Sequence, residues 1–448
     1  MTKVARALCA AVLTVVMVSC SNGAAKVAQI APTPIATADF SGTGPGSLIE
    51  AMSMPNIDRK IRALGAKAVR VVYRSTSGID DTPTEVSAAV FIPTGTAPPG
   101  GWPVIAYAHG TSGINNDCGP SLSPDLYGAA TLITQYLKLG FAVAATDYQG
   151  LGHPGAHPYL DAKTAGLNVI DSVRALRAVS KDVSTSWGVF GGSQGGGASW
   201  AANEQATTYA TDLNLVGTVA LVPAADISGF AAAAATQTLT KDQQAAYIWV
   251  LMGLQRTRPD FPIDDYRHGQ LTQDWDALSI CTGPRAEERA RALNDLNPAD
   301  LVPTTPEAEQ RLTDLLTRTA LPQQPTAAPM QVIYGGKDSY INPEWTTTAI
   351  DRACALGDTI DAILQPDKGH GDIDGTPSIQ WLGERFQNQP APNTCPTPPR
   401  DESSTNTESG TESGTESGTG SESGTGSESG TGSESGTESG TDTESGGG

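Results

Sequence analysis

The stretch WGVFGGSQGGG, residues 187–197, decides the fold of this chain. Its first four residues are apolar and typical of a buried strand, and the residues after the glycines favour a helix built from small side chains. Between the two lies a G-x-S-x-G pattern centred on Ser193. In such a pattern the serine occupies a strained strand-to-helix turn, and the glycines let neighbouring backbones approach closely. We therefore expect Ser193 to be a nucleophile rather than part of a plain glycine-rich turn.

A serine hydroxyl becomes nucleophilic when a histidine accepts its proton and a carboxylate orients that histidine. After a turn of this kind the order along the chain is serine, acid, histidine. Of the five histidines, this order leaves His268 and His370. His370 is the predicted base, because it lies in a glycine-flanked loop just after the apolar run TIDAIL. His268 precedes every strand that could carry the acid.

The acid is expected at the end of the preceding strand. The run MQVIY, residues 330–334, leads into the sequence GGKD, which ends at Asp338. Asp338 is therefore the predicted acid, and Asp367 is its competitor. Asp367 lies only three residues before His370, a position more typical of a residue that caps a turn.

An enzyme of this kind also needs two backbone N–H groups for the oxyanion of the tetrahedral intermediate. Gln194, the residue after the nucleophile, is expected to supply one. Thr111 is expected to supply the other, because it follows the apolar run PVIAYA in the loop HGTSG. His109 in that loop and Asp147 in the next are expected to have structural roles.

The rest of the body alternates between strands and helices and then stops alternating. Apolar or β-rich runs predict strands at 69–73, 87–92, 103–108, 141–146, 187–190, 215–222, 330–334 and 359–364. Helical patterns cover 125–139, 167–179, 231–235, 242–254, 285–296 and 306–318. The first two strands favour an antiparallel pair. We predict an α/β core at 45–223 and 326–398, interrupted by a helical lid at 224–325 near the carboxyl ends of the strands.

Both ends of the chain predict segments outside the fold. Lys3 and Arg6 precede an apolar stretch at 7–18 that is short for a membrane span but typical of an export signal. The stretch ends in MVSC, which resembles a bacterial lipobox with Cys20 as the lipidated residue; cleavage near Ala24 is the alternative. Residues 21–44 are expected to be a linker, and the acidic Ser/Thr/Gly/Glu repeats of 399–448 contain nothing to bury and predict disorder. We expect an exported bacterial protein, either secreted or attached to the membrane through Cys20.

Composition excludes some functions and limits others. The chain has 28 basic and 48 acidic residues and a net charge of −20, which disfavours binding to nucleic acid. Beyond Cys20, four cysteines remain, and an even number in an exported chain favours two disulfides with three possible pairings. They are Cys118, Cys281, Cys354 and Cys395. No C-x-x-C spacing occurs, so no metal site is expected; no organic cofactor is implied either, and the chain is expected to be a monomer.

Several motifs together are more specific than any one of them. YAHGTSG with Cys118 shortly after, ATDYQGLG followed by HPYL, GGSQGGG, GGKD and GHGD all occur between residues 45 and 395. The combination resembles the α/β-hydrolases, and more narrowly the secretory (lipase A-type) lipases. The resemblance implies a mostly parallel central sheet, a helical lid, and Ser193, Asp338 and His370 as nucleophile, acid and base. It also implies the disulfides Cys118–Cys281 and Cys354–Cys395. Gly192 departs from the family, where many relatives carry a larger residue such as His or Tyr.

These observations predict an exported serine ester hydrolase, a lipase or carboxylesterase acting on acyl esters or triacylglycerols through an acyl-enzyme. One alternative is a peptidase of the same fold, which would need a carboxylate in the lid, such as Glu287, Glu288 or Asp264, to bind a substrate amine. Another alternative is a non-catalytic surface lipoprotein. The apolar lid segments at 230–235 and 247–254 either line an acyl tunnel or simply pack the lid onto the sheet.

Overall fold

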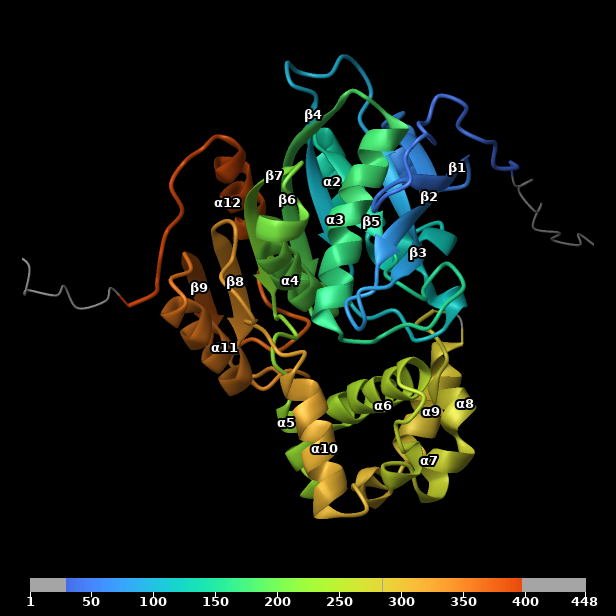
Figure 1. Ribbon diagram of the computed structural model, residues 1–448, viewed down its shortest axis with the longest axis vertical. Coiled ribbons are helices and arrows are strands. Elements are labelled where there is room, and N and C mark those ends of the chain that lie inside the picture. The colour runs from blue at the N-terminus through green and yellow to red at the C-terminus, as the bar shows by residue number, and fades with distance from the viewer. Residues whose placement is uncertain (1–29, 284, 397–448) are drawn as a thin grey trace, which may run out of the picture. The chain divides into compact units, whose positions relative to one another are not determined.

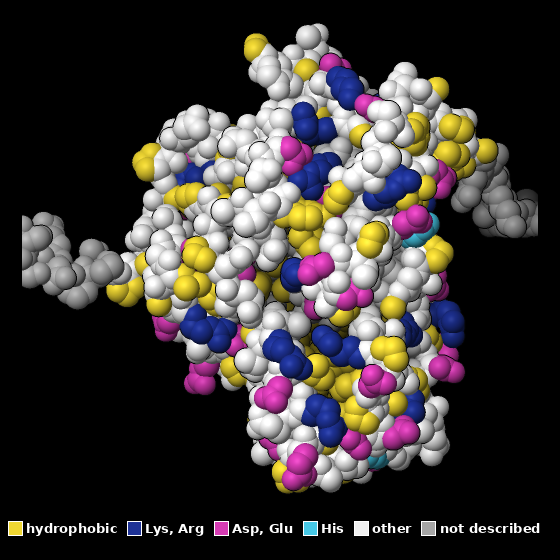
Figure 2. Space-filling view, in the orientation of Figure 1, with side chains coloured by type: hydrophobic (Ala, Val, Ile, Leu, Met, Phe, Trp, Pro, Cys, Tyr) yellow, Lys and Arg dark blue, Asp and Glu magenta, His cyan; other side chains and the backbone are white. Residues whose placement is uncertain are grey.

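The computed structural model describes residues 30–283 and 285–396. The predicted export signal with Cys20, and the acidic tail at 399–448, lie outside the described residues. Among the residues that are described, no helix is long and apolar enough to cross a membrane. On the face drawn in Figure 2, Lys and Arg side chains are scattered among Asp and Glu rather than gathered into one patch.

Nine strands form one sheet in the order β1-β2-β3-β5-β4-β6-β7-β8-β9 (Figure 1). The strands are β1 (Leu48–Ser53), β2 (Lys67–Thr76), β3 (Pro83–Ile92), β4 (Trp102–Ala108), β5 (Ala142–Thr146), β6 (Val183–Gly192), β7 (Asn214–Leu221), β8 (Met330–Gly335) and β9 (Ile360–Gln365). The pairs β1–β2, β2–β3 and β3–β5 are antiparallel, and the remaining five pairs are parallel. The predicted mostly parallel sheet, opened by an antiparallel pair, is confirmed. The edge strand β1 was not predicted, because its sequence LIEAMS lacks a continuous apolar run and only Leu48 and Ala51 in it are buried.

Helices cover both faces of the sheet. On one face lie α3 (Ala162–Val179), α4 (Gln194–Tyr209) and α11 (Pro343–Ala355); on the other lie α1 (Arg59–Ala63), α2 (Ala130–Lys138) and α12 (Pro377–Phe386). Strand β4 shows why, because its apolar residues are buried on both sides: Val104 faces the α3 side, and Ile105 faces the α2 side.

The helical insertion lies between β7 and β8, within residues 224–325, at one end of the sheet (Figure 1). We refer to it as the lid. Its helices are α5 (Gly229–Ala235), α6 (Lys241–Thr257), α7 (Gly269–Gln273), α8 (Trp275–Leu278), α9 (Ala286–Asp295) and α10 (Pro306–Thr317). Helix α6 begins at a capping box in which the side chains of Thr240 and Gln243 bond each other's backbone N–H. Phe230, Tyr247 and Leu312 belong to an apolar core that the lid shares with neighbouring loops.

Candidate active site

Ser193 occupies a strained turn between β6 and α4. Its backbone has φ 60° and ψ −119°, a conformation that non-glycine residues rarely adopt. Neighbouring backbone holds it there, because the Ser193 N–H donates to the Leu221 carbonyl at 2.9 Å and the Ser193 carbonyl accepts from the Ala224 N–H at 3.0 Å. The end of β7 thus fixes the turn from both sides and directs the serine to the carboxyl edge of the sheet.

The glycines around this turn are not equivalent. A Cβ on Gly191 would lie 2.2 Å from the Gly195 carbonyl oxygen, and a Cβ on Gly195 would lie 2.0 Å from the Ala108 carbonyl oxygen. Both positions therefore require glycine for close backbone approach. A Cβ on Gly192 would meet nothing nearer than Leu221 at 3.8 Å. This position has room for a side chain, which agrees with the larger residue expected in relatives.

The structure brings Ser193, His370 and Asp338 into one hydrogen-bonded row. Nε2 of His370 lies 2.8 Å from the Ser193 hydroxyl oxygen, and Nδ1 of His370 lies 2.7 Å from Oδ2 of Asp338. The other carboxylate oxygen of Asp338 accepts from the N–H groups of Tyr340 and Ile341 at 2.8 and 2.9 Å. The carboxylate favours the tautomer with the proton on Nδ1, so Nε2 is left as the acceptor for the serine proton.

The competing residues lie elsewhere. The side chain of Asp367 is 89% exposed and pairs with Lys337 at 3.0 Å. His268 lies in the lid, where Nε2 contacts the Val302 carbonyl oxygen at 3.1 Å. The loop carrying Asp338 packs tightly on the loop carrying His370, because a Cβ on Gly335 would lie 2.3 Å from the Lys368 carbonyl oxygen. The glycines of GGKD therefore allow the two loops to meet.

The two expected oxyanion donors come from different elements: Gln194 from the first turn of α4, and Thr111 from the loop after β4. Gln194 begins α4, where backbone N–H groups have no partner within the helix. Thr111 lines the same cavity as Ser193, and its hydroxyl is 2.8 Å from the Tyr159 hydroxyl. Within the described part of the chain, neither backbone N–H donates to another protein group. Both remain available for a ligand.

His157 is a residue at this site that the sequence analysis did not assign, although the motif HPYL contains it. Its Nδ1 lies 2.8 Å from the Gln149 carbonyl oxygen, and its Nε2 lies 3.2 Å from the side-chain nitrogen of Gln194. Burial lowers the pKa of His157 to about 3, so the ring is neutral at ordinary pH. Nδ1 then donates to Gln149, and Nε2 accepts from the Gln194 amide.

His109 and Asp147 support the loops, as expected. The buried carboxylate of Asp147 accepts from the Ser121 N–H at 2.7 Å and from the Ser87 hydroxyl at 2.6 Å. The Tyr148 hydroxyl donates to the His109 carbonyl at 2.9 Å. These bonds fix the start of the loop that carries Thr111.

A cavity of about 290 Å³ joins the serine and histidine to the lid. Its lining consists of Thr111, Tyr159, Leu160, Ser193, Ala224, Ala245, Ala246, Trp249, Thr282, Arg289, Tyr340, Ile341 and His370. From the apolar lid segments, only Trp249 reaches this cavity, whereas Phe230 and Tyr247 are fully buried in the lid core. Most of these segments therefore pack the lid.

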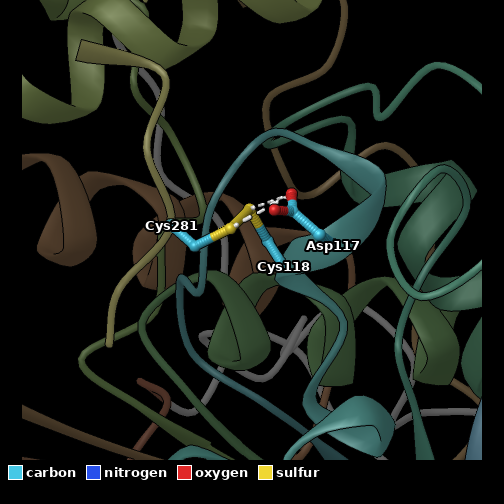
Figure 3. Close-up of side chains that lie close together, drawn as sticks. All are labelled: Asp117, Cys118 and Cys281. Atoms are coloured by element: carbon cyan, nitrogen blue, oxygen red, sulfur yellow. Dashed lines mark hydrogen bonds between the residues drawn. A yellow bond between two sulfur atoms is a disulfide. The ribbon is translucent and has the colours of Figure 1, made fainter. Parts of the chain in front are cut away.

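Two disulfides are present, with the pairing that the resemblance implied. Cys118–Cys281 joins the loop after β4 to the lid, and Cys354–Cys395 joins α11 to the segment after α12. The Asp117 carboxylate lies beside the first disulfide (Figure 3). This cluster is not a metal site, because the two sulfurs are bonded to each other and cannot act as thiolate ligands.

Known lipases and esterases resemble this chain in sequence and in fold. The family model described as Secretory lipase matches residues 127–282. A probable inactive lipase of Mycobacterium tuberculosis is 25% identical over 345 residues, which cover 72% of this chain and 74% of that protein. Candida antarctica lipase A in its closed state has a TM-score of 0.66 at 18% identity, covering 81% of this chain and 87% of that one. A ligand-bound form of the rice cell wall degrading esterase LipA from Xanthomonas oryzae has a TM-score of 0.59 at 18% identity, covering 78% of this chain and 96% of that one. The α/β-hydrolase fold is confirmed.

Proposed function

We propose that this chain, which is a homologue of the secretory lipases with the α/β-hydrolase fold, is an exported serine hydrolase of carboxylic esters. The hydrogen-bonded row from Ser193 through His370 to Asp338, open to a cavity under the lid, carries the proposal. No other arrangement of nucleophile, base and acid among the described residues shares that cavity.

The reaction follows from the geometry. The Ser193 oxygen attacks the ester carbonyl carbon while Nε2 of His370 accepts the hydroxyl proton, and Asp338 stabilises the imidazolium. The N–H groups of Gln194 and Thr111 bind the oxyanion of the tetrahedral intermediate. The C–O bond to the alcohol then breaks, His370 gives its proton to the departing alkoxide, and an acyl-enzyme remains. Water, deprotonated by His370, releases the acid and restores Ser193.

The size of the cavity supports short esters as substrates. At about 290 Å³ it lies just below the range found for small-molecule sites, about 300–1,000 Å³. A short acyl chain with a small alcohol fits such a volume, whereas a long-chain triacylglycerol would need the lid to move away. We therefore favour a carboxylesterase over a triacylglycerol lipase.

The two alternatives differ in their support. The peptidase would need a lid carboxylate, but the residues lining the cavity include no acid. Glu288 pairs with Arg285 and Asp264 pairs with Arg267 instead. The non-catalytic alternative is favoured by the mycobacterial relative, which is named a probable inactive lipase. The non-catalytic protein is therefore the second candidate, and a measurement of the activity of Ser193 decides between it and the esterase.

Export is part of the proposal. The matching family is described as secretory, and two disulfides are typical of proteins outside the reducing cytosol. Attachment through a lipidated Cys20 is testable by the mass of the mature N-terminal peptide and by its loss in a Cys20→Ser variant. Release of an unlipidated chain cleaved near Ala24 would contradict that attachment.

The experiment is hydrolysis of p-nitrophenyl esters, with acyl chains of two to sixteen carbons, by the purified mature protein and its Ser193→Ala variant. Turnover by the wild type and none by the variant supports the esterase, and we expect the shortest chains to be fastest. A folded wild type that hydrolyses none of these esters contradicts the proposal and leaves the non-catalytic protein as the better reading.

A further inference from the structure

Arg289 places a positive charge in the cavity that contains Ser193 and His370. It projects from α9, in the lid, and its side chain is half-buried. An apolar acyl chain makes no hydrogen bond or ion pair with a guanidinium. Burying such a cation in a cavity that excludes water also costs hydration free energy. Hydrolysis of a neutral ester therefore does not account for a cation at this position.

The protein holds this guanidinium without neutralising it. The Arg289 carbon Cζ lies 4.4 Å from the ring centroid of Trp249, and one terminal nitrogen donates to the Ile280 carbonyl at 3.1 Å. Among the described residues, no carboxylate forms an ion pair with Arg289. The adjacent acid, Glu288, is already paired with Arg285. An arginine carries five N–H donors, and within residues 30–283 and 285–396 the bond to Ile280 occupies one of those on Arg289.

The pKa of Arg289 also reflects the lack of a nearby carboxylate across the described chain. Burial lowers the pKa of Arg289, and the groups that act against burial are the hydroxyls of Tyr159 and Tyr340, not a carboxylate. Arg174, another partly buried arginine, shows the contrast, because it pairs with both Asp171 and Asp212. Among the residues that the structure describes, Arg289 thus has no counter-charge of the kind that Arg174 has.

The support under Arg289 is rigid. The Trp249 indole N–H donates to the Leu278 carbonyl at 2.8 Å, and the Tyr159 ring packs edge-on against the Trp249 ring at 5.8 Å. A guanidinium stacked on a fixed aromatic ring loses little freedom when it binds a ligand. Its planar fork matches the two oxygens of a carboxylate.

We propose that Arg289 forms an anion-binding subsite, and that the preferred substrates are esters carrying a free carboxylate on their acyl or alcohol part. The ester carbonyl lies at Ser193, and the carboxylate reaches across the cavity to the guanidinium. Water-soluble half-esters of dicarboxylic acids and esters of hydroxy acids have this chemistry. The inference rests on the proposed function, because it names the substrate class of the same site.

Two matched ester pairs test it. Monomethyl glutarate against dimethyl glutarate places the charge on the acyl side, and 4-acetoxybenzoate against its methyl ester places it on the alcohol side. We expect the wild type to prefer the charged member of one pair, which identifies the side. Arg289→Met should lower kcat/KM for that ester about 10- to 100-fold, mainly through KM, and change the neutral ester by less than about threefold. Arg289→Lys should retain part of the preference, because it keeps the charge but loses the fork.

Arg291→Met is the matched control, because Arg291 is an exposed arginine on the same helix whose side chain donates to the Glu287 carbonyl at 3.3 Å. It should leave both esters unchanged. Equal losses on charged and neutral esters in Arg289→Met, or no preference in the wild type, would overturn the subsite while ester hydrolysis stands.

Binding measured without turnover separates the two proposals. Calorimetry of monomethyl glutarate and of 4-acetoxybenzoate with Ser193→Ala, and with Ser193→Ala/Arg289→Met, reports the subsite directly on both sides of the ester. Binding that depends on Arg289 in a protein that hydrolyses no ester would support the subsite and overturn the proposed function. Equal binding of each charged ester by both variants would overturn the subsite.

Discussion

Nε2 of His157 lies 3.2 Å from the side-chain nitrogen of Gln194, the residue that follows the proposed nucleophile. The contact joins the loop after β5 to the first turn of α4. It depends on a neutral imidazole, and burial ensures this by lowering the pKa of His157 to about 3. We therefore infer that His157 is a positioning residue for the Gln194 backbone N–H, the proposed oxyanion donor.

His157→Phe keeps a ring in place but removes the acceptor for the Gln194 amide. We expect kcat on a p-nitrophenyl ester to fall about 10-fold, with KM nearly unchanged, because the oxyanion donor is displaced rather than lost. His153→Phe is the control, since His153 pairs with Glu85 away from the cavity. A fall in the melting temperature with normal kcat would instead assign His157 a purely structural role.

Asparagine variants of Asp338 and Asp367 test which of the two carboxylates is the catalytic acid of the proposed triad. Asp338→Asn should lower kcat by about 10³- to 10⁴-fold, because an amide no longer holds the reactive histidine tautomer. Asp367→Asn should leave kcat unchanged, since that carboxylate is exposed and paired with Lys337. Steady-state rates on one short ester suffice, and similar losses in both variants would refute the assignment.

The glycines of the turn should respond differently to alanine. Gly195→Ala forces a Cβ to within 2.0 Å of the Ala108 carbonyl oxygen, whereas Gly192→Ala meets nothing closer than 3.8 Å. We expect Gly195→Ala to lower the melting temperature strongly or to prevent folding, and Gly192→Ala to change it little. Thermal melts of both variants check this. Equal melting temperatures would show that the β4 and α4 backbones can separate freely.

Glu204 is buried in α4, and we expect it to make the free energy of unfolding fall as pH rises. Burial raises the pKa of this carboxyl from 4.5 to about 7. Between these values the unfolded chain ionises while the folded chain keeps the proton, so folding becomes less favourable as pH rises, and the whole cost is present above pH 7. Glu204→Gln keeps the shape and the acceptor for the Gln323 N–H but cannot ionise.

Urea unfolding at two pH values measures this effect. Glu204→Gln should be more stable than the wild type at pH 8, by up to ~3 kcal/mol. At pH 4 the difference should nearly vanish, because Glu204 is then protonated in the folded chain and largely protonated in the unfolded one. A constant difference at both values would show that Glu204 titrates alike in the folded and the unfolded chain, so that burial does not raise its pKa.

Much of the fold could be predicted because its signals are local. The apolar runs PVIAYA, MQVIY and TIDAIL correspond to β4, β8 and β9, and the lid helices were visible as the stretch where the alternation of strands and helices breaks. Strand β1 was missed because an edge strand needs no buried run on both faces. The short helices α7 and α8 were missed too, since segments of four or five residues carry little periodicity.

The sequence by itself determined the strand–turn–helix around Ser193 and the order of serine, acid and histidine. Those features depend on residues within a few positions of one another, where glycines and apolar spacing limit what the backbone can do. Only the tertiary structure decided that His157 supports Gln194, and that Arg289 lies in the cavity with no carboxylate partner in the described part of the chain. These contacts join segments far apart along the chain. Packing of the loop after β5 on α4 forms the first contact, and packing of the lid on the core brings Arg289 to the cavity; no local pattern predicts either.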